Sequence, residues 1–457
     1  MTTDELALLA DAADRAAAYI AGLRDRRVHP DEDAIAGLTR FEEALPTEGR
    51  PAEEGLALLD EAGSPATVAS NGGRYFGYVV GAALPAAAAA DRLLGAWDQS
   101  GGSPAGTVIE EVAARWVLDI LDLPAESAVG FGTSASACAV GCLSTARRVL
   151  LARAGWSVEE AGLVGAPRVR AVVSAHCHVT VLKALRVLGF GSRDIIRAPT
   201  DAHGRVDPAR LPAIDALTVL CLQAGEVNTG EFDPFPEIIP AARRVGAWVH
   251  VDGAFGLWAR ASGQHRALTD GVDQADSWTV DGHKWLNTPY DVAMSICRHA
   301  GALAETLNSD AHYAPSSPRA QRNLTVEFSR KPRGILVWAA LRALGRSGVA
   351  ALVERHLAQA TRVAETLRSA GFELLNRVVL NQVLVRGPND EATHFIRAAV
   401  EQSGDAWFGA SQWEQRVAFR LSLSSWRTGE DDVERLLTAL LRARDEARRA
   451  GLWPDES

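Results

Sequence analysis

The chain has 457 residues, of which 47% are hydrophobic and 23% charged, a balance that is typical of a well-cored globular protein and excludes a disordered one. The net charge of −10 argues against nucleic-acid binding, which needs a basic surface. An odd number of cysteines, five, favours a reduced protein over a disulfide framework. The acidic N-terminus lacks the basic start of a signal peptide, and no apolar run reaches the ~20 residues that span a bilayer. We therefore expect a cytoplasmic chain without a membrane partner.

The predicted elements divide the chain into three zones. Residues 1–100 are helical in pattern and show no core of their own. Residues 101–330 alternate helical stretches with continuous apolar runs, which predicts a parallel sheet covered on both faces. Residues 331–457 open with a helix, continue through short strands and close with a charged helix from Gly429 to Arg449, which predicts a smaller α+β domain. The apolar runs of the middle zone are 168–175, 217–224, 247–253, 276–282 and 292–298.

Two charged residues follow these runs, where an open α/β sheet binds its ligands. Lys284 in VDGHKW has apolar neighbours. Most lysines are solvated surface groups, but an amine in apolar surroundings loses its proton more readily, as a Schiff-base nucleophile requires. Asp252 ends the run WVHVD. It is either a turn or capping residue, or a buried anion that keeps a pyridine nitrogen protonated.

The segment GFGTSASACAVG leads small residues into a helix predicted to start at about Ser136. Free backbone N–H groups and the helix dipole favour a phosphate at such a position. Gly130, Gly132 and Ala135 also match the dinucleotide pattern G-x-G-x-x-A, but the acidic residue that a ribose contact needs ~20 residues later is absent. A nicotinamide-binding oxidoreductase is therefore the weaker alternative.

His178 in SAHCHVTVLKAL is either a capping or core residue, or a flat ring that stacks on a cofactor. His176 lies near it, but no third ligand accompanies the pair, so we expect no metal. Along the chain, the order is a phosphate segment, His178, Asp252 and then, 32 residues later, Lys284. This order suits a cofactor that carries a phosphate, a pyridine nitrogen and an aldehyde.

These motifs make residues 70–440 similar to the pyridoxal-phosphate-dependent group II decarboxylases, which include the aromatic-L-amino-acid and glutamate decarboxylases. HVDGAFG resembles the family's HVDAA motif, and ADSWTVDGHKW resembles its Asn-Pro-His-Lys-Trp motif. SASACAVGC resembles its phosphate segment, and HVTVLKAL, AGEVNTGEFDPF and SSWRTGEDDVERLL resemble three further motifs. The resemblance implies an α/β fold of the aspartate-aminotransferase type (PLP fold type I), with a mostly parallel seven-stranded sheet and a small C-terminal α+β domain. It also implies an intertwined homodimer in which residues 1–100 pack on the partner.

The resemblance further implies pyridoxal phosphate (PLP) as the cofactor and decarboxylation of an L-amino acid to an amine and CO2 through a Schiff base on Lys284. Asp252 would pair with the pyridine nitrogen and His178 would stack on the ring, where related aminotransferases usually carry a different aromatic residue. The expected catalytic residues are thus Lys284, His178 and Asp252. The expected cofactor-binding residues are Ser134, Ala135, Ser136, His178, Glu226, Asp252, Ala254, His283 and Lys284.

Two departures from the family pattern leave alternatives open. Glu226 stands where relatives carry a small polar residue, so it either acts beside the cofactor's phenolic oxygen or points away to a basic partner. Many family members carry a tyrosine on a mobile loop that protonates the substrate carbon, but residues 316–327 contain none, and Tyr313 only borders them. Transamination and aldehyde-forming oxidation on the same cofactor therefore stand as alternatives, with a catalytically silent binding protein as a third.

Phe76, Tyr78 and Trp97 resemble the family's aromatic substrate segment and suit an apolar or aromatic side chain, although each is also compatible with a core position. Arg330 and Arg333 are candidates to bind a side-chain carboxylate. The sequence does not identify the amino acid.

Overall fold

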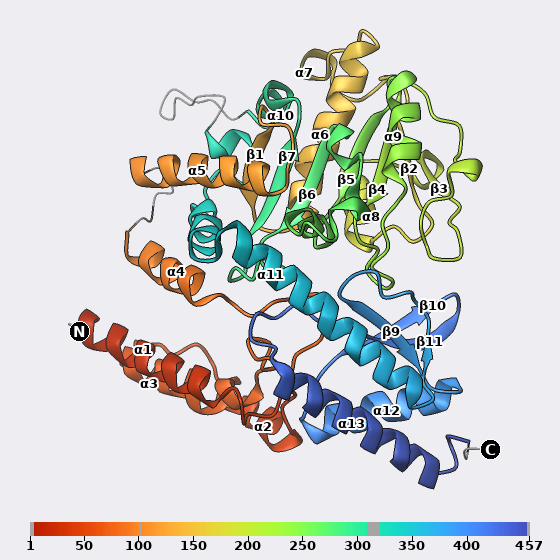
Figure 1. Ribbon diagram of the computed structural model, residues 1–457. Coiled ribbons are helices and arrows are strands. Elements are labelled where there is room, and N and C mark those ends of the chain that lie inside the picture. The colour runs from red at the N-terminus through yellow and green to blue at the C-terminus, as the bar shows by residue number, and fades with distance from the viewer. Residues whose placement is uncertain (1–3, 98, 100–102, 309–319, 455–457) are drawn as a thin grey trace. The chain divides into compact units, whose positions relative to one another are not determined.

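The computed structural model describes residues 4–97, 99, 103–308 and 320–454 (Figure 1). Its contacts divide the chain into two compact units. The sheet unit comprises Ala83–Ala360 and Asn376–Gln382, and the terminal unit comprises Met1–Ala82, Thr361–Leu375 and Val383–Ser457. This division joins the N-terminal zone to the C-terminal one, whereas the sequence predicted separate zones at 1–100, 101–330 and 331–457. That residues 1–100 pack on a dimer partner stays a prediction.

The sheet unit is built on seven strands in the order β1-β7-β6-β5-β4-β2-β3 (Figure 1). The pairs β2–β3, β2–β4, β4–β5 and β5–β6 are parallel, and β7 runs antiparallel to both of its neighbours. The predicted mostly parallel seven-stranded sheet is thus confirmed. The strands are β1 Ala128–Gly132, β2 Arg170–Ser174, β3 Ile195–Ala198, β4 Thr218–Gln223, β5 Trp248–Asp252, β6 Ser277–Asp281 and β7 Ala293–Cys297.

Every residue of β4, β5, β6 and β7 is buried, which explains why their sequences read as continuous apolar runs. The helices of this unit are α4 Pro85–Trp97, α5 Pro104–Ile120, α6 Ala135–Arg153, α7 Val158–Ala161, α8 Val179–Val187, α9 Phe235–Arg244, α10 Ala300–Thr306 and α11 Gly334–Ser369, whose end lies in the terminal unit.

Two of these helices, α6 and α11, are long and apolar enough by composition to cross a membrane. Helix α6 instead packs against β5, β6 and β7. Helix α11 is interrupted at Gly345, whose φ of 62° is not helical. The apolar composition of α6 is therefore explained by its place against the sheet.

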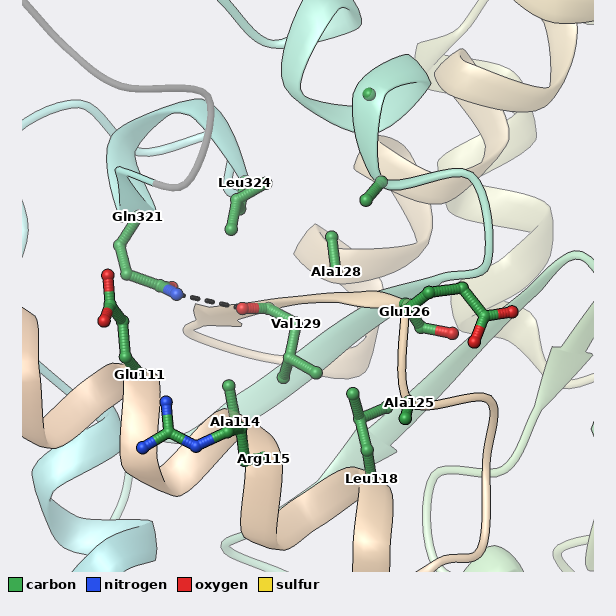
Figure 2. A pocket seen from close by; sticks show the side chains of 13 residues that line it. Glu111, Ala114, Arg115, Leu118, Ala125, Glu126, Ala128, Val129, Gln321 and Leu324 are labelled. Carbon is green, nitrogen blue, oxygen red and sulfur yellow. Dashed lines mark hydrogen bonds between the residues drawn. The ribbon is translucent and has the colours of Figure 1, made fainter.

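Strand β1 lies at an edge of the sheet, where a side chain takes the place of a neighbouring strand. The Gln321 amide nitrogen donates to the Val129 carbonyl at 2.9 Å (Figure 2). The Phe131 N–H donates to the Gln321 amide oxygen at 2.8 Å. A cavity of about 400 Å³ lies beside this contact, between α5, β1 and α10. Its lining contains none of the residues that the sequence assigns to the cofactor.

The terminal unit combines helices with a four-stranded sheet in the order β10-β11-β9-β8. The charged last helix was predicted well: α13 runs from Glu430 to Arg449 and Gly429 is its N-cap. Helices α1, α2 and α3 contain no buried residue. The elements are α1 Glu5–Gly22, α2 Glu32–Ala36, α3 Ala52–Leu58, β8 Glu373–Leu374, β9 Gln382–Arg386, α12 Asp390–Ser403, β10 Gly409–Trp413, β11 Arg416–Ser422 and α13 Glu430–Arg449.

Candidate active site

The carboxyl ends of the parallel strands bring the predicted residues to one edge of the sheet. Asp252 is the last residue of β5, and Lys284 follows the end of β6 by three residues. His178 follows β2, and Glu226 follows β4. The expectation that functional groups gather at this edge therefore fits the topology.

Asp281, the last residue of β6, connects the lysine to the predicted phosphate segment. Its Oδ2 lies 3.0 Å from Lys284 Nζ, and its Oδ1 accepts the Ala135 N–H at 2.8 Å. His283 Nε2 lies 3.7 Å from the same Oδ1. Both carboxylate oxygens are buried with the side chain, which is only 3% exposed. An amine and a helix N-terminus thus lie on opposite sides of one carboxylate.

The N-terminus of α6 begins where the small-residue segment predicted it. Ser134 is the N-cap and its hydroxyl accepts the Ala137 N–H at 3.3 Å. Ala135 and Ser136 form the first turn, so their N–H groups lie at the positive end of the helix dipole. Just before the cap, the Thr133 N–H donates to Glu327 Oε1 at 3.2 Å.

Asp252 lies on the strand next to β6 and is 8% exposed. Its Oδ1 accepts the Ala254 N–H at 3.2 Å and lies 3.5 Å from the Thr279 hydroxyl. Burial, and then the charge of Asp252, raises the pKa of Cys177 to about 12. Asp252 is therefore a buried carboxyl group at the end of the strand next to β6, the strand that Lys284 follows.

His178 caps the following helix. It is the N-cap of α8, and its Nδ1 lies 2.7 Å from the Thr180 hydroxyl and accepts the Thr180 N–H at 3.4 Å. The capping role that the sequence left open is thus observed. The contacts to Thr180 hold the His178 imidazole through Nδ1. The face of the ring can still stack on a cofactor.

Glu226 is held by its own loop. Its Oε2 accepts the N–H groups of Asn228 at 2.8 Å and Thr229 at 2.7 Å, and the Thr229 hydroxyl at 3.0 Å. Burial raises the pKa of this carboxyl, although the backbone hydrogen bonds oppose the shift. In the structure the carboxylate anchors the turn after β4, and the predicted contact of Glu226 with the cofactor's oxygen stays a prediction.

The predicted substrate residues differ in exposure. Phe76 is completely buried, whereas Tyr78 and Trp97 are 63% and 59% exposed. Tyr313, which borders the loop discussed above, lies outside the described residues.

The two arginines considered for a substrate carboxylate are both paired. Arg330 forms a buried bidentate pair with Glu110, in which both side chains are 3% exposed. Arg333 Nε donates to Asp291 Oδ1 at 2.9 Å. Arg330 is therefore committed to the fold and not to a substrate.

Two residues near Lys284 were not predicted, Asp281 and Tyr290. The Tyr290 ring stacks on His283, with centroids 4.1 Å apart and planes inclined by 23°. Burial, and secondly Asp281, raises the pKa of Tyr290, while burial lowers the pKa of His283 and keeps its imidazole neutral. The spacing Asp281–Lys284 was the available signal, since residues three apart in a turn lie close together.

This donor set fits a phosphorylated pyridine aldehyde. It offers an amine, a helix N-terminus for a phosphate and a buried carboxylate on the neighbouring strand for a ring nitrogen. Among the described residues, no group of three or more His, Cys, Asp or Glu side chains is placed to hold a metal.

Residues 82–386 match the pyridoxal-dependent decarboxylase conserved domain. The chain belongs to this family. It is 30% identical over 433 residues to an L-2,4-diaminobutyrate decarboxylase from Rhizobium meliloti (strain 1021), covering 87% of this chain and 81% of the relative. It is 26% identical over 354 residues to an aromatic-L-amino-acid decarboxylase from Bacillus atrophaeus, covering 72% and 71%.

The fold is similar to that of Oryza sativa TDC, solved with PLP and tryptamine. The TM-score is 0.88 at 22% sequence identity, over 98% of this chain and 99% of that one. The expected PLP fold type I, the PLP cofactor and the activity of an amino-acid decarboxylase are thus confirmed, and transamination and aldehyde formation are not favoured.

Proposed function

We propose that this decarboxylase converts an L-amino acid into its amine and CO2 with Lys284 as the residue that holds the cofactor aldehyde. The observation that carries the proposal is the position of Lys284 Nζ, one carboxylate away from the N-terminus of α6. A PLP molecule needs its aldehyde and its phosphate satisfied at the same time, and these two groups of the chain match that need.

The other predicted site residues have separate roles toward the ring and the phosphate of the cofactor. When bound, PLP supplies an electron sink for the electron pair left on the substrate carbon as CO2 departs. Asp252 would hold a proton on the ring nitrogen of the bound cofactor, because a buried carboxylate favours the protonated form of a neighbouring base. The backbone at Ala135 and Ser136, with the Ser134 hydroxyl and His283, would hold the phosphate, and Ala254 and His178 would contact the pyridine ring.

We propose an apolar or aromatic side chain for the substrate. Tyr78 and Trp97 expose large aromatic surfaces in the N-terminal part of the chain. The pairing of Arg330 with Glu110 removes one of the two arginines that an acidic substrate would use. A screen of the common L-amino acids for CO2 release tests this assignment, and turnover of aspartate or glutamate alone would overturn it.

We also propose that the chain acts as a homodimer in the cytoplasm. Helices α1, α2 and α3 bury no residue. Leu6 and Leu9 on α1 are 78% and 58% exposed, and Leu59, which directly follows α3, is 60% exposed. Exposed apolar side chains of this size favour a protein partner. Free cysteines, four of them buried, suit a reducing compartment. Light scattering on the parent and on Leu6→Lys/Leu9→Lys tests the dimer, and a parent that is monomeric at micromolar concentration would refute it.

The Lys284→Ala variant tests the central assignment. We expect it to lose the visible absorbance that a lysine-bound cofactor gives and to lose CO2 release, because no other lysine follows β6 closely. Lys183→Ala, in α8, is the matched control and should keep both signals. A Lys284→Ala protein with undiminished absorbance would show that another amine holds the cofactor.

A further inference from the structure

Asp281 places a negative charge where the phosphate of the cofactor is expected. Its Oδ1 takes the first free N–H of α6, from Ala135, and its Oδ2 pairs with Lys284 Nζ. A carboxylate at this point occupies the same donor that a phosphate would use. The family motif quoted above has a neutral asparagine at this position.

A second carboxylate acts on the same segment. Glu327 Oε1 accepts the Thr133 N–H at 3.2 Å, and its Oε2 is buried without a hydrogen-bond partner in the described part of the chain. After burial, the charges of Asp281 and Glu327 are the two largest influences that raise the pKa of Cys138, which lies in the first turn of α6. Both carboxylates therefore face the same end of this helix.

We infer that Asp281, supported by Glu327, is an internal anion that holds the phosphate segment and Lys284 in place before the cofactor binds and that weakens the binding of the cofactor phosphate afterwards. A phosphate ester carries about −1.5 to −2 charges at pH 7, so it meets like charge at this helix end. Asp281 is thus a positioning residue. Its contacts hold the phosphate segment and Lys284 in place, while its negative charge repels the phosphate of the cofactor. This inference rests on the assignment of Lys284 and the α6 N-terminus as the cofactor site.

The consequence is a chain that keeps its site ordered when it is empty. Two hydrogen-bond donors of the segment, the N–H groups of Thr133 and Ala135, are satisfied by the carboxylates of Glu327 and Asp281. The Lys284 ammonium is likewise neutralised by Asp281. Cofactor binding must exchange these contacts for contacts to phosphate, so the gain in free energy on binding is smaller than in a chain with a neutral residue at 281.

Asp281→Asn tests the inference because it removes the charge and keeps the shape. Cofactor is removed from the purified full-length protein, and the affinities for PLP, for pyridoxal without phosphate and for inorganic phosphate are then measured by titration. Since a nearby like charge commonly changes such equilibria by a factor of about ten or more, we expect the ratio of PLP to pyridoxal affinity to rise about tenfold or more in Asp281→Asn. The affinity for pyridoxal, which has no phosphate, changes only through the lost contact between residue 281 and Lys284. The ratio of PLP to pyridoxal affinity therefore isolates the effect of Asp281 on the phosphate.

Asp276→Asn is the matched control. Asp276 immediately precedes β6, at the end opposite Asp281, and its carboxylate likewise accepts a backbone N–H, from Val249 at 2.8 Å. It should leave the ratio unchanged. Glu327→Gln should raise the ratio in the same direction and remains informative if Asp281→Asn does not fold.

An unchanged or lower ratio in Asp281→Asn, or in Glu327→Gln where that variant replaces it, would overturn the inference. Failure of the function proposed above has a different signature, namely visible cofactor absorbance that persists in Lys284→Ala. The two outcomes are therefore separable in one set of proteins.

Discussion

Replacing Arg330 with methionine removes the cation from a buried ion pair. The guanidinium donates to both Glu110 oxygens, at 2.9 and 2.6 Å, and to the Phe131 carbonyl at 3.1 Å. The substitution leaves the Glu110 carboxylate buried with the Gly334 N–H, at 3.0 Å, as its remaining donor among the contacts described. We therefore expect a large loss of stability without a change in substrate preference.

The magnitude follows from the burial of both partners. Breaking a buried ion pair from one side costs about 3–5 kcal/mol. With an unfolding entropy of about 2.1 cal/mol/K per residue, a cooperative loss over this chain corresponds to a Tm lower by roughly 3–5 °C. The double variant Glu110→Gln/Arg330→Met removes both charges and keeps an acceptor for Gly334. It should recover about half or more of that loss, because no unpaired charge stays buried.

Thermal unfolding of the parent, of Arg330→Met, of Glu110→Gln and of the double variant measures the coupling between the two side chains. Steady-state kinetics on the same proteins gives KM for the amino acid. We expect KM to change less than twofold in Arg330→Met, since the guanidinium is committed to Glu110. A parent-like Tm in Arg330→Met, or a double variant no more stable than the single ones, would refute the reasoning. A selective rise in KM would instead assign Arg330 to the substrate.

Three other predictions follow from single contacts. Asp252→Asn should lower kcat by about 10²-fold or more while the cofactor still binds, because the ring nitrogen loses its anion, and parent-like turnover would exclude this role. Burial lowers the pKa of His250 to about 4, so the unfolded chain binds the extra proton between pH 6.5 and 4 and stability falls by up to about 3 kcal/mol on acidification through that window. His250→Asn should flatten the pH dependence of Tm there. Gly256→Ala should cost about 1–3 kcal/mol, because its Cβ would lie 2.3 Å from the Ala224 carbonyl oxygen, whereas Gly263→Ala, with open space around it, should be neutral in the same melts.

The buried strands could be predicted because both of their faces are covered. The runs at 217–224 and 276–282 contain β4 and β6 almost residue for residue. Strand β1 was not among the predicted apolar runs, since two of its five residues are glycine. A Cβ on Gly130 would lie 1.9 Å from the Leu324 carbonyl oxygen, so the glycine is required by a segment almost 200 residues away. Strand β3 has four residues and lies at the other edge, which leaves it little apolar signal.

The positions of Lys284 after β6 and of Asp252 at the end of β5 could be predicted, because each follows from a single apolar run and the residue at its end. Their roles toward the cofactor stay predictions. The contact between Asp281 and Ala135 could not be predicted, because the two residues are 146 positions apart and only the sheet order brings them together. Glu226 illustrates the opposite case. Its partners are two and three residues later, so the sequence carried a local signal for its role in the turn, but only the cofactor's oxygen and a basic partner were considered as its targets.

The side-chain amide of Gln321 satisfies backbone hydrogen-bonding groups on the exposed edge of strand β1. An exposed strand edge is a template on which a foreign strand can add, and natural sheets commonly block it with charge, proline or a bulge. Here a single side chain reproduces the hydrogen-bonding pattern of a neighbour at Val129 and Phe131. Gln321 therefore occupies hydrogen-bonding groups of β1 that an added strand would use, and a variant that lacks this amide is expected to expose them.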